Sequence, residues 1–177
     1  MRMEVTQNGL KYGLSTLHAW IRSMECVLNI AYRMEVKKWS IRSDDDKEKV
    51  KKRKLEIQEV LKNSRFGLLV DVPKPGGSGT TNTGNVARRF FQNADDIADL
   101  IGFDKAILRR LHIILSCLSS GYTIDAVKLR TFVSELCKSI MNEIREVDLV
   151  GVQASLKTIS VTDSLLLWVT RIPSNRC

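Results

Sequence analysis

The chain has 177 residues, of which 44% are hydrophobic and 27% are charged, and this composition is typical of one globular domain. Its formal net charge of +8, with a pI near 9.5, favours an acidic partner, and nucleic acid is the commonest such partner for a basic domain of this size. A membrane span is not expected, because the longest apolar run, Leu165–Val169, is far below the roughly 18 residues that cross a bilayer.

The surplus of positive charge lies in the first half of the chain. Residues 1–94 carry 18 basic and 10 acidic side chains, whereas residues 95–177 carry ten of each. An acidic ligand is therefore expected to bind the N-terminal half.

The cysteines indicate a reducing compartment. Cys26, Cys117, Cys137 and Cys177 are widely spaced and form no CxxC pair, which favours reduced thiols packed as small hydrophobes over disulfides or a metal site. The N-terminus has no apolar segment typical of a signal peptide. We expect a nuclear protein, or otherwise a cytoplasmic one.

The first predicted element is an amphipathic helix over Leu14–Trp39, after an N-terminal extension of residues 1–13. Ser15 or Thr16 can cap its start. Its apolar residues recur at steps of three and four: Leu14, Leu17, Ile21, Met24, Leu28, Ala31 and Met34.

A second helix is predicted over Lys47–Asn63, preceded by three aspartates that suit the positive end of a helix. Its thin apolar stripe, which indicates a surface helix packed on one side, consists of Val50, Leu55 or Ile57, Val60 and Leu61. The run KVKKRK at Lys49–Lys54 matches a nuclear-import pattern and could also contact phosphates through Lys51, Lys52 and Arg53. A solvated helix surface is the simpler alternative.

The helical pattern stops between Ser64 and Asn85, where prolines, glycines and small hydroxyl residues accumulate. We expect an ordered loop, because its apolar residues must pack: Phe66, Leu68, Leu69, Val70 and Val72. A helix is predicted to begin at VARRFF, capped by Asn85 or Thr83. Three more helices are predicted after it: from Asp95 or Asp96 to Ile101, over Asp104–Ser119 and over Ile124–Ile144. The predicted fold is mainly α, a bundle of about five helices over residues 14–145 with an irregular tail at 146–177.

The stretch Gly76–Arg89 is the candidate site. Glycines let backbone amides approach a phosphate, threonines add donors, and a helix starting near Asn85 would aim its N-terminal amides the same way, with Arg88 and Arg89 in its first turn. On this geometry the two arginines should matter more for DNA than the run Lys49–Lys54. It is not a nucleotide P-loop, since no Gly-Lys-Ser/Thr follows. The alternative is a glycine-rich turn that only joins helices.

No catalytic or metal site is expected. His18 and His112 lie inside helical patterns with no second ligand at a suitable spacing, and core or boundary histidines are the better interpretation. A divalent ion could in principle be held by four carboxylates, which helix capping and solubility explain as well: Asp71, Asp95, Asp96 and Asp99.

Three stretches of the sequence resemble the C-terminal part of the catalytic core of the V(D)J recombinase and the Transib-type transposases: LHAWIRSMECVLNIAYRMEVKKW, KEKVKKRKLEIQEVL and VPKPGGSGTTNTGNVARRFF. The resemblance covers about residues 14–145 and is most specific in the loop ending in GNVARR. In that family the segment is a helical insertion between the second and third catalytic carboxylates of an RNase H-like DDE nuclease. The resemblance implies DNA contacts by Thr80, Thr81, Thr83, Asn85, Arg88 and Arg89.

The departures from that family are equally informative. Its first two catalytic carboxylates would precede Met1, and no histidine follows His112 to form the family's zinc-binding pair. Without those groups the chain is not expected to hold the two metal ions of phosphoryl transfer. We therefore expect a fragment, a degenerate transposon copy or a domesticated insertion domain.

The leading hypothesis is a non-catalytic DNA-binding helical domain that uses no cofactor or metal and grips phosphates through the loop GGSGTTNTGNVARR. Two alternatives stay open. One is a helical interaction or oligomerisation scaffold that uses the helix Leu14–Trp39, and the other is a subunit of a metal-dependent nuclease completed by another chain. Other transposase chains or a second copy of this chain are the further partners considered.

Overall fold

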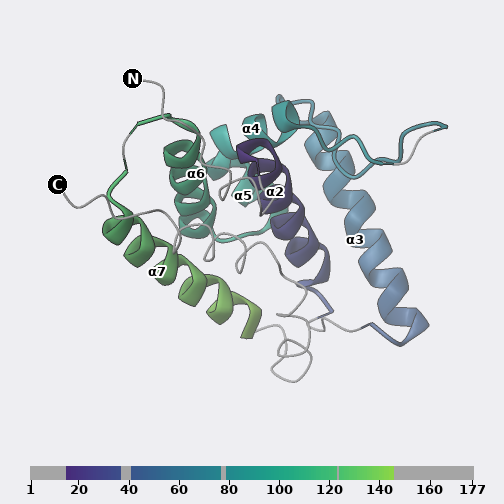
Figure 1. The fold of residues 1–177 in the computed structure, drawn as a ribbon. Helices are drawn as coiled ribbons and strands as arrows, with labels where there is room; N and C mark the ends of the chain where they lie inside the picture. The colour runs from purple at the N-terminus through teal and green to yellow at the C-terminus, as the bar shows by residue number, and fades with distance from the viewer. Residues whose placement is uncertain (1–14, 37–40, 77–78, 123, 146–177) are drawn as a thin grey trace.

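The computed structural model describes residues 15–36, 41–76, 79–122 and 124–145. Within these ranges the secondary structure is mainly helical, as predicted, and the helices are α2 (Thr16–Arg33), α3 (Asp44–Asn63), α4 (Gly84–Gln92), α5 (Ala94–Ile101), α6 (Lys105–Ser119) and α7 (Ala126–Arg145) (Figure 1). The expected N-terminal extension and C-terminal tail lie outside the described residues, as do Trp39 and Cys177. The described helices are each too short or too polar to cross a bilayer.

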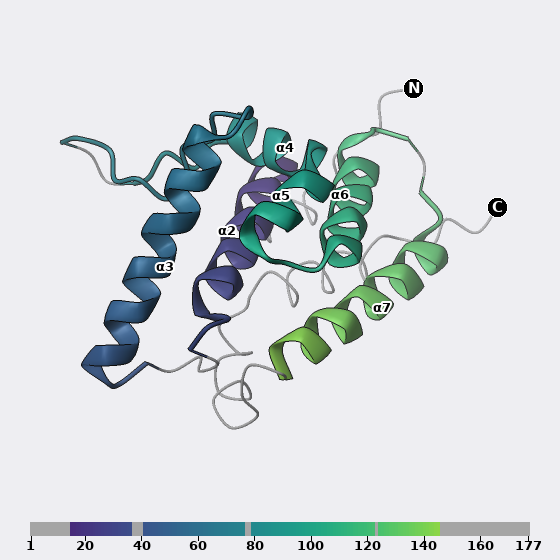
Figure 2. The same ribbon diagram turned by 180° about the vertical axis from the view of Figure 1, so that it is seen from behind.

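Helix α2 lies at the centre of the bundle. It packs against α3, α4 and α6. Helix α5 contacts both α3 and α6, and α7 packs mainly on α6 (Figures 1 and 2). Ser15 caps the start of α2, since its hydroxyl accepts a bond from the His18 amide at 3.3 Å. Because α2 has neighbours on several sides, its buried face is wider than a single stripe.

The apolar periodicity of α2 predicted its helical state but only part of its buried face. Met24, Leu28 and Ala31 are fully buried, whereas Leu17 is 43% exposed. The face is widened by residues outside the predicted stripe: Ala19, Trp20, Ser23, Val27, Ile30 and Tyr32. Helix α2 also ends at Arg33, six residues before the predicted end at Trp39.

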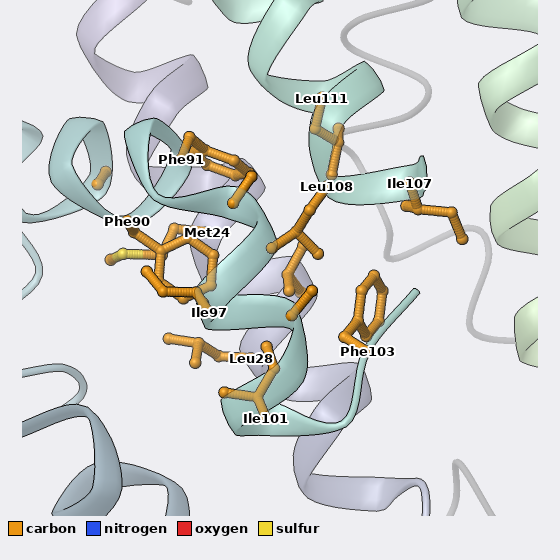
Figure 3. Close-up of a cluster of buried hydrophobic side chains, with 14 of the residues drawn as sticks. Met24, Leu28, Phe90, Phe91, Ile97, Ile101, Phe103, Ile107, Leu108 and Leu111 are labelled. Atoms are coloured by element: carbon orange, nitrogen blue, oxygen red, sulfur yellow. The ribbon is translucent and has the colours of Figure 1, made fainter. Parts of the chain in front are cut away.

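The core forms where α2, α4, α5 and α6 meet. Figure 3 shows Met24 and Leu28 of α2 beside Phe90 of α4 and Ile97 and Ile101 of α5, and all five side chains are fully buried. This packing fixes α4 and α5 against α2, and therefore fixes where the loop before α4 leaves the bundle.

Helix α3 covers one side of this core with a thin face. Only Ile57 and Leu61 are buried, while Leu55 is 57% exposed, so the predicted choice between Leu55 and Ile57 falls on Ile57. The helix starts at Asp44 instead of Lys47, which places the three aspartates inside its first turn. Most of its circumference faces solvent, as expected for a surface helix.

Candidate nucleic-acid interface

The segment after α3 makes a turn, closed by a bond from the Gly67 amide to the Ser64 carbonyl at 3.0 Å, and then runs along the core. Phe66, Leu68 and Val70 are buried, whereas Leu69 and Val72 are exposed. The side chains of an extended chain point alternately to opposite sides, so Leu68 and Val70 reach the core and Leu69 does not, and the positive φ of Asp71 ends this alternation before Val72. The expectation that this loop is ordered and packed is confirmed, although two of its five apolar residues face solvent.

The chain then forms a narrow antiparallel hairpin that sequence patterns did not predict. The Thr81 amide donates to the Val72 carbonyl at 2.9 Å, and the Lys74 amide donates to the Gly79 carbonyl at 3.1 Å. Pro73 and Thr80 form the bridge between these bonds. We call residues 72–76 and 79–81 the arm.

The arm extends away from the bundle. Both views show it reaching past α3, on the side of the molecule opposite α7 (Figures 1 and 2). Its described residues are exposed, except that Thr80 and Thr81 are half-buried. Lys74 is its only charged described residue.

The base of the arm is closed by Asn82 and Asp71. The Asn82 carboxamide accepts a bond from the Asp71 amide at 2.9 Å and donates to the Asp71 carboxylate at 2.5 Å. Its nitrogen also lies 3.2 Å from a carboxylate oxygen of Glu25 on α2. Asp71 adopts φ 52°, a left-handed conformation that Asp and Asn tolerate better than most residues.

The same base is tied to α2 and α3. The Tyr32 hydroxyl donates to Asp71 at 2.9 Å, and the Gln58 carboxamide donates to the Val70 carbonyl at 2.9 Å. Lys54 lies 4.0 Å from the Asp71 carboxylate and 5.5 Å from the centre of the Tyr32 ring. Burial, together with the negative charge and hydrogen bond of Asp71, raises the pKa of Tyr32 above its ordinary value. The direction of the arm is therefore fixed by side chains from two helices.

The sequence predicted that the glycines and the start of α4 would bind one phosphate together. The structure differs, because the arm separates the described glycines from the start of α4. Gly76 and Gly79 lie toward the outer end of the arm, whereas the α4 N-terminus lies at its base. Thr83 caps α4, as one of the two predicted caps, with its hydroxyl accepting a 3.4 Å bond from the Val86 amide. The amides of the two described glycines, Gly76 and Gly79, therefore do not converge with the helix amides on one anion.

Helix α4 starts at Gly84, next to the predicted start near Asn85, but Arg88 and Arg89 then lie in its second turn and not in the predicted first turn. Consecutive residues point about 100° apart on a helix, so the two side chains diverge. The Arg89 guanidinium donates to the Phe66 carbonyl and thereby joins α4 to the segment after α3. Arg88 and Asn85 are exposed.

One flank of α3 concentrates positive charge. Lys47, Lys51, Lys54 and Lys62 follow at steps of four, three and eight residues, which places them on one side of the helix. Gln58 lies between the last two and bonds the base of the arm, so this side faces the arm. We call these four residues the lysine flank. Lys47 pairs with Asp44 at 2.7 Å, and Lys54 lies 4.0 Å from Asp71. Lys51 and Lys62 are exposed, and neither forms an ion pair with another described residue.

The opposite flank of α3 carries both signs of charge. Its members follow one another at steps of four and three residues: Asp45, Lys49, Lys52, Glu56 and Glu59. The predicted basic run is therefore divided by the helix, with Lys51 and Lys54 on the arm side and Lys49 and Lys52 away from it.

Arg53 belongs to neither surface. Its guanidinium donates to the Ile101 carbonyl at the end of α5, at 3.2 Å, and lies 3.5 Å from Glu35 and 3.6 Å from Glu56. Its side chain is only 25% exposed. Arg53, which the sequence predicted as a DNA contact, is therefore used for contacts within the fold.

The carboxylates considered for a metal ion are dispersed. Asp95 binds Arg109 at 2.5 Å, Asp96 binds Arg65 at 2.5 Å, and Asp99 binds Lys105 at 2.7 Å. The hydrogen bond from Arg109 holds the pKa of Asp95 below its ordinary value. Within the described ranges, no three His, Cys, Asp or Glu side chains are grouped as a metal site would require.

The two histidines have ordinary surroundings. His18 places its Nδ1 atom 2.8 Å from the Ser15 hydroxyl at the start of α2. The His112 ring lies edge-on to Trp20, with 6.0 Å between ring centres. His112 is half-buried and fits the predicted boundary role, whereas His18 is exposed at the start of α2.

Comparison with known proteins found no family model and no curated protein that matches this chain.

Proposed function

We propose that the chain is a non-catalytic, DNA-binding helical domain of the DDE transposase lineage, and that the lysine flank of α3 is its main phosphate-binding surface. One observation carries the proposal: four lysines gather on the side of a surface helix that adjoins a projecting arm. Duplex DNA presents rows of phosphates, and a row of lysines along a helix of Asp44–Asn63 can neutralise several of them.

This proposal shifts the main role from the arginine pair to the lysines. The expected advantage of Arg88 and Arg89 rested on a phosphate held jointly by the glycines and the α4 N-terminus. Since the arm separates those groups, and Arg89 already bonds the Phe66 carbonyl, only Arg88 stays available as an additional phosphate contact.

The scaffold alternative receives less support. The helix considered for assembly, α2, uses its apolar residues in the core of its own bundle, and Leu17 is its only large hydrophobic side chain that is exposed. A surface for a partner helix would need an apolar stripe that faces solvent.

The test compares two double variants of α3 that remove the same charge. Lys51→Ala with Lys62→Ala alters the lysine flank, and Lys49→Ala with Lys52→Ala alters the opposite flank; all four side chains are exposed. Binding to a random-sequence duplex is measured by fluorescence anisotropy across a salt series. The first variant should reduce the slope of log K against log salt by about 0.9 for each phosphate that the protein no longer neutralises, and the second should reduce it much less. Equal effects of the two variants, or no salt-dependent binding by the wild-type chain, would contradict the proposal.

A further inference from the structure

The arm differs chemically from the lysine flank beside it. Among its described residues Lys74 supplies the only charge, and the rest are small, apolar or hydroxylic: Val72, Pro73, Pro75, Gly76, Gly79, Thr80 and Thr81. One cation adds little to the electrostatic attraction of four lysines. The arm therefore needs an explanation other than phosphate binding.

Its side chains are poorly suited to the major groove. Sequence reading there depends on long side chains with two hydrogen-bonding groups, such as Arg, Asn and Gln. None of these residue types occurs in the described part of the arm. Asn82 and Gln58, which could read a base, are committed to the base of the arm by bonds of 2.9 Å each.

The same side chains suit the minor groove. That groove is narrow, its negative potential attracts single cations, and proteins that enter it often insert proline or another apolar wedge between base steps. Pro75 precedes Gly76 toward the outer end of the arm, and Lys74 is adjacent to it. Both are exposed. The Lys74 amide donates to the Gly79 carbonyl, so its backbone is held in the hairpin while the Lys74 side chain faces solvent.

We propose that the arm enters the minor groove of the duplex whose phosphates contact the lysine flank, with Lys74 over A·T base edges and Pro75 as a wedge. This inference rests on the proposed function, since the lysine flank must first hold the duplex. The base of the arm supplies the rigidity that insertion requires. A mobile hairpin would lose conformational entropy on binding, which lowers affinity. Contacts among Asp71, Asn82 and Tyr32 fix the direction of the arm before it binds, so this cost is smaller.

The experiment uses the full chain, an A·T-rich and a G·C-rich duplex of equal length, and two groove-selective competitors. Netropsin occupies the A·T minor groove, and methyl green occupies the major groove. We expect netropsin to displace the protein and methyl green to leave it bound. Wild-type protein should prefer the A·T-rich duplex by roughly fivefold or more, the lower end of what one misread base pair costs.

Arm variants are compared with a matched surface variant. Lys74→Ala should abolish the A·T preference, while Lys52→Ala, which removes the same charge from the opposite flank of α3, should retain it. Pro75→Ala should reduce the bend of the duplex measured by energy transfer between its labelled ends. Because these side chains lie outside the core, circular dichroism should be unchanged.

The outcomes separate the two proposals. Salt-dependent binding that methyl green blocks and netropsin does not, or an A·T preference that survives Lys74→Ala, would overturn the minor-groove role and leave the lysine flank intact. Absence of salt-dependent binding would overturn both.

Discussion

Asn82 bonds the amide and the carboxylate of Asp71, at 2.9 Å and 2.5 Å, and so closes the two ends of the arm with one side-chain pair. The two residues are eleven apart in the chain, and the turn between them projects from the bundle. The orientation of the proposed DNA-reading element therefore depends on a contact that lies outside that element.

Asn82→Ala should lower the free energy of unfolding by about 1–3 kcal/mol, because it leaves the half-buried Asp71 amide without its partner. Urea unfolding followed by circular dichroism measures this. Asn85→Ala is the control, since Asn85 is exposed and its side chain forms no hydrogen bond with another described residue. Equal stability of the two variants would mean that the base contacts do not hold the arm.

Tyr32→Phe tests the link between α2 and the arm. Tyr32 is fully protonated at pH 7, and its folded pKa is raised above the ordinary value near 10 by burial first and by Asp71 second. The raised pKa gives stability that is complete below about pH 10 and is lost as the pH rises above it, because the unfolded state then releases the proton first. The variant should have a free energy of unfolding about 1.5–3 kcal/mol lower at pH 7, as expected for the loss of a hydrogen bond to a charged acceptor, and its stability should depend less on pH between 9 and 11 than that of the wild type. Thermal unfolding over that pH range provides the measurement, and parallel curves would contradict the assignment.

Arg53→Ala should destabilise the fold by about 1–2 kcal/mol, because it removes a charged donor from the Ile101 carbonyl at the end of α5. Its neighbour Lys52 is exposed, and Lys52→Ala should change stability very little. Chemical unfolding of the two variants shows whether one residue of the basic run is structural while the adjacent one is not.

Cys26 should react slowly with alkylating reagents in the folded protein. It lines a small apolar cavity between α2, α6 and α7, and burial raises the pKa of its thiol to about 11. At pH 8 about one such thiol in a thousand is ionised, so unfolding in urea should speed its reaction about a hundredfold or more. A variant with the other cysteines changed to serine, followed by mass spectrometry, gives the rates. Similar rates before and after unfolding would show that the cavity is open.

The chain alone should not cleave or join DNA with Mg²⁺ or Mn²⁺, in keeping with its proposed non-catalytic role. Asp95, Asp96 and Asp99 are each paired with a different cation on the protein surface. Incubation with supercoiled plasmid tests this, and metal-dependent nicking that an Asp96→Asn variant lacks would refute it.

The sequence by itself determined the helices and most of their limits. Steps of three and four predicted α4, α5, α6 and α7 to within about two residues, and Ser15, Thr83 and Asp104 cap α2, α4 and α6. Caps and periodicity are local, so residues within a few positions of one another suffice to specify them.

Only the tertiary structure decided the arm and the division of the basic run. Asn82 bonds Glu25, 57 residues away, and Arg53 bonds Ile101, 48 residues away, so neither role has a signature in its own neighbourhood of the sequence. One local signal did exist: the steps from Lys47 to Lys62 already place four lysines on one helix side. Which side of α3 adjoins the arm followed only from the packing of Ile57 and Leu61 into the core, because that burial fixes the rotation of the helix.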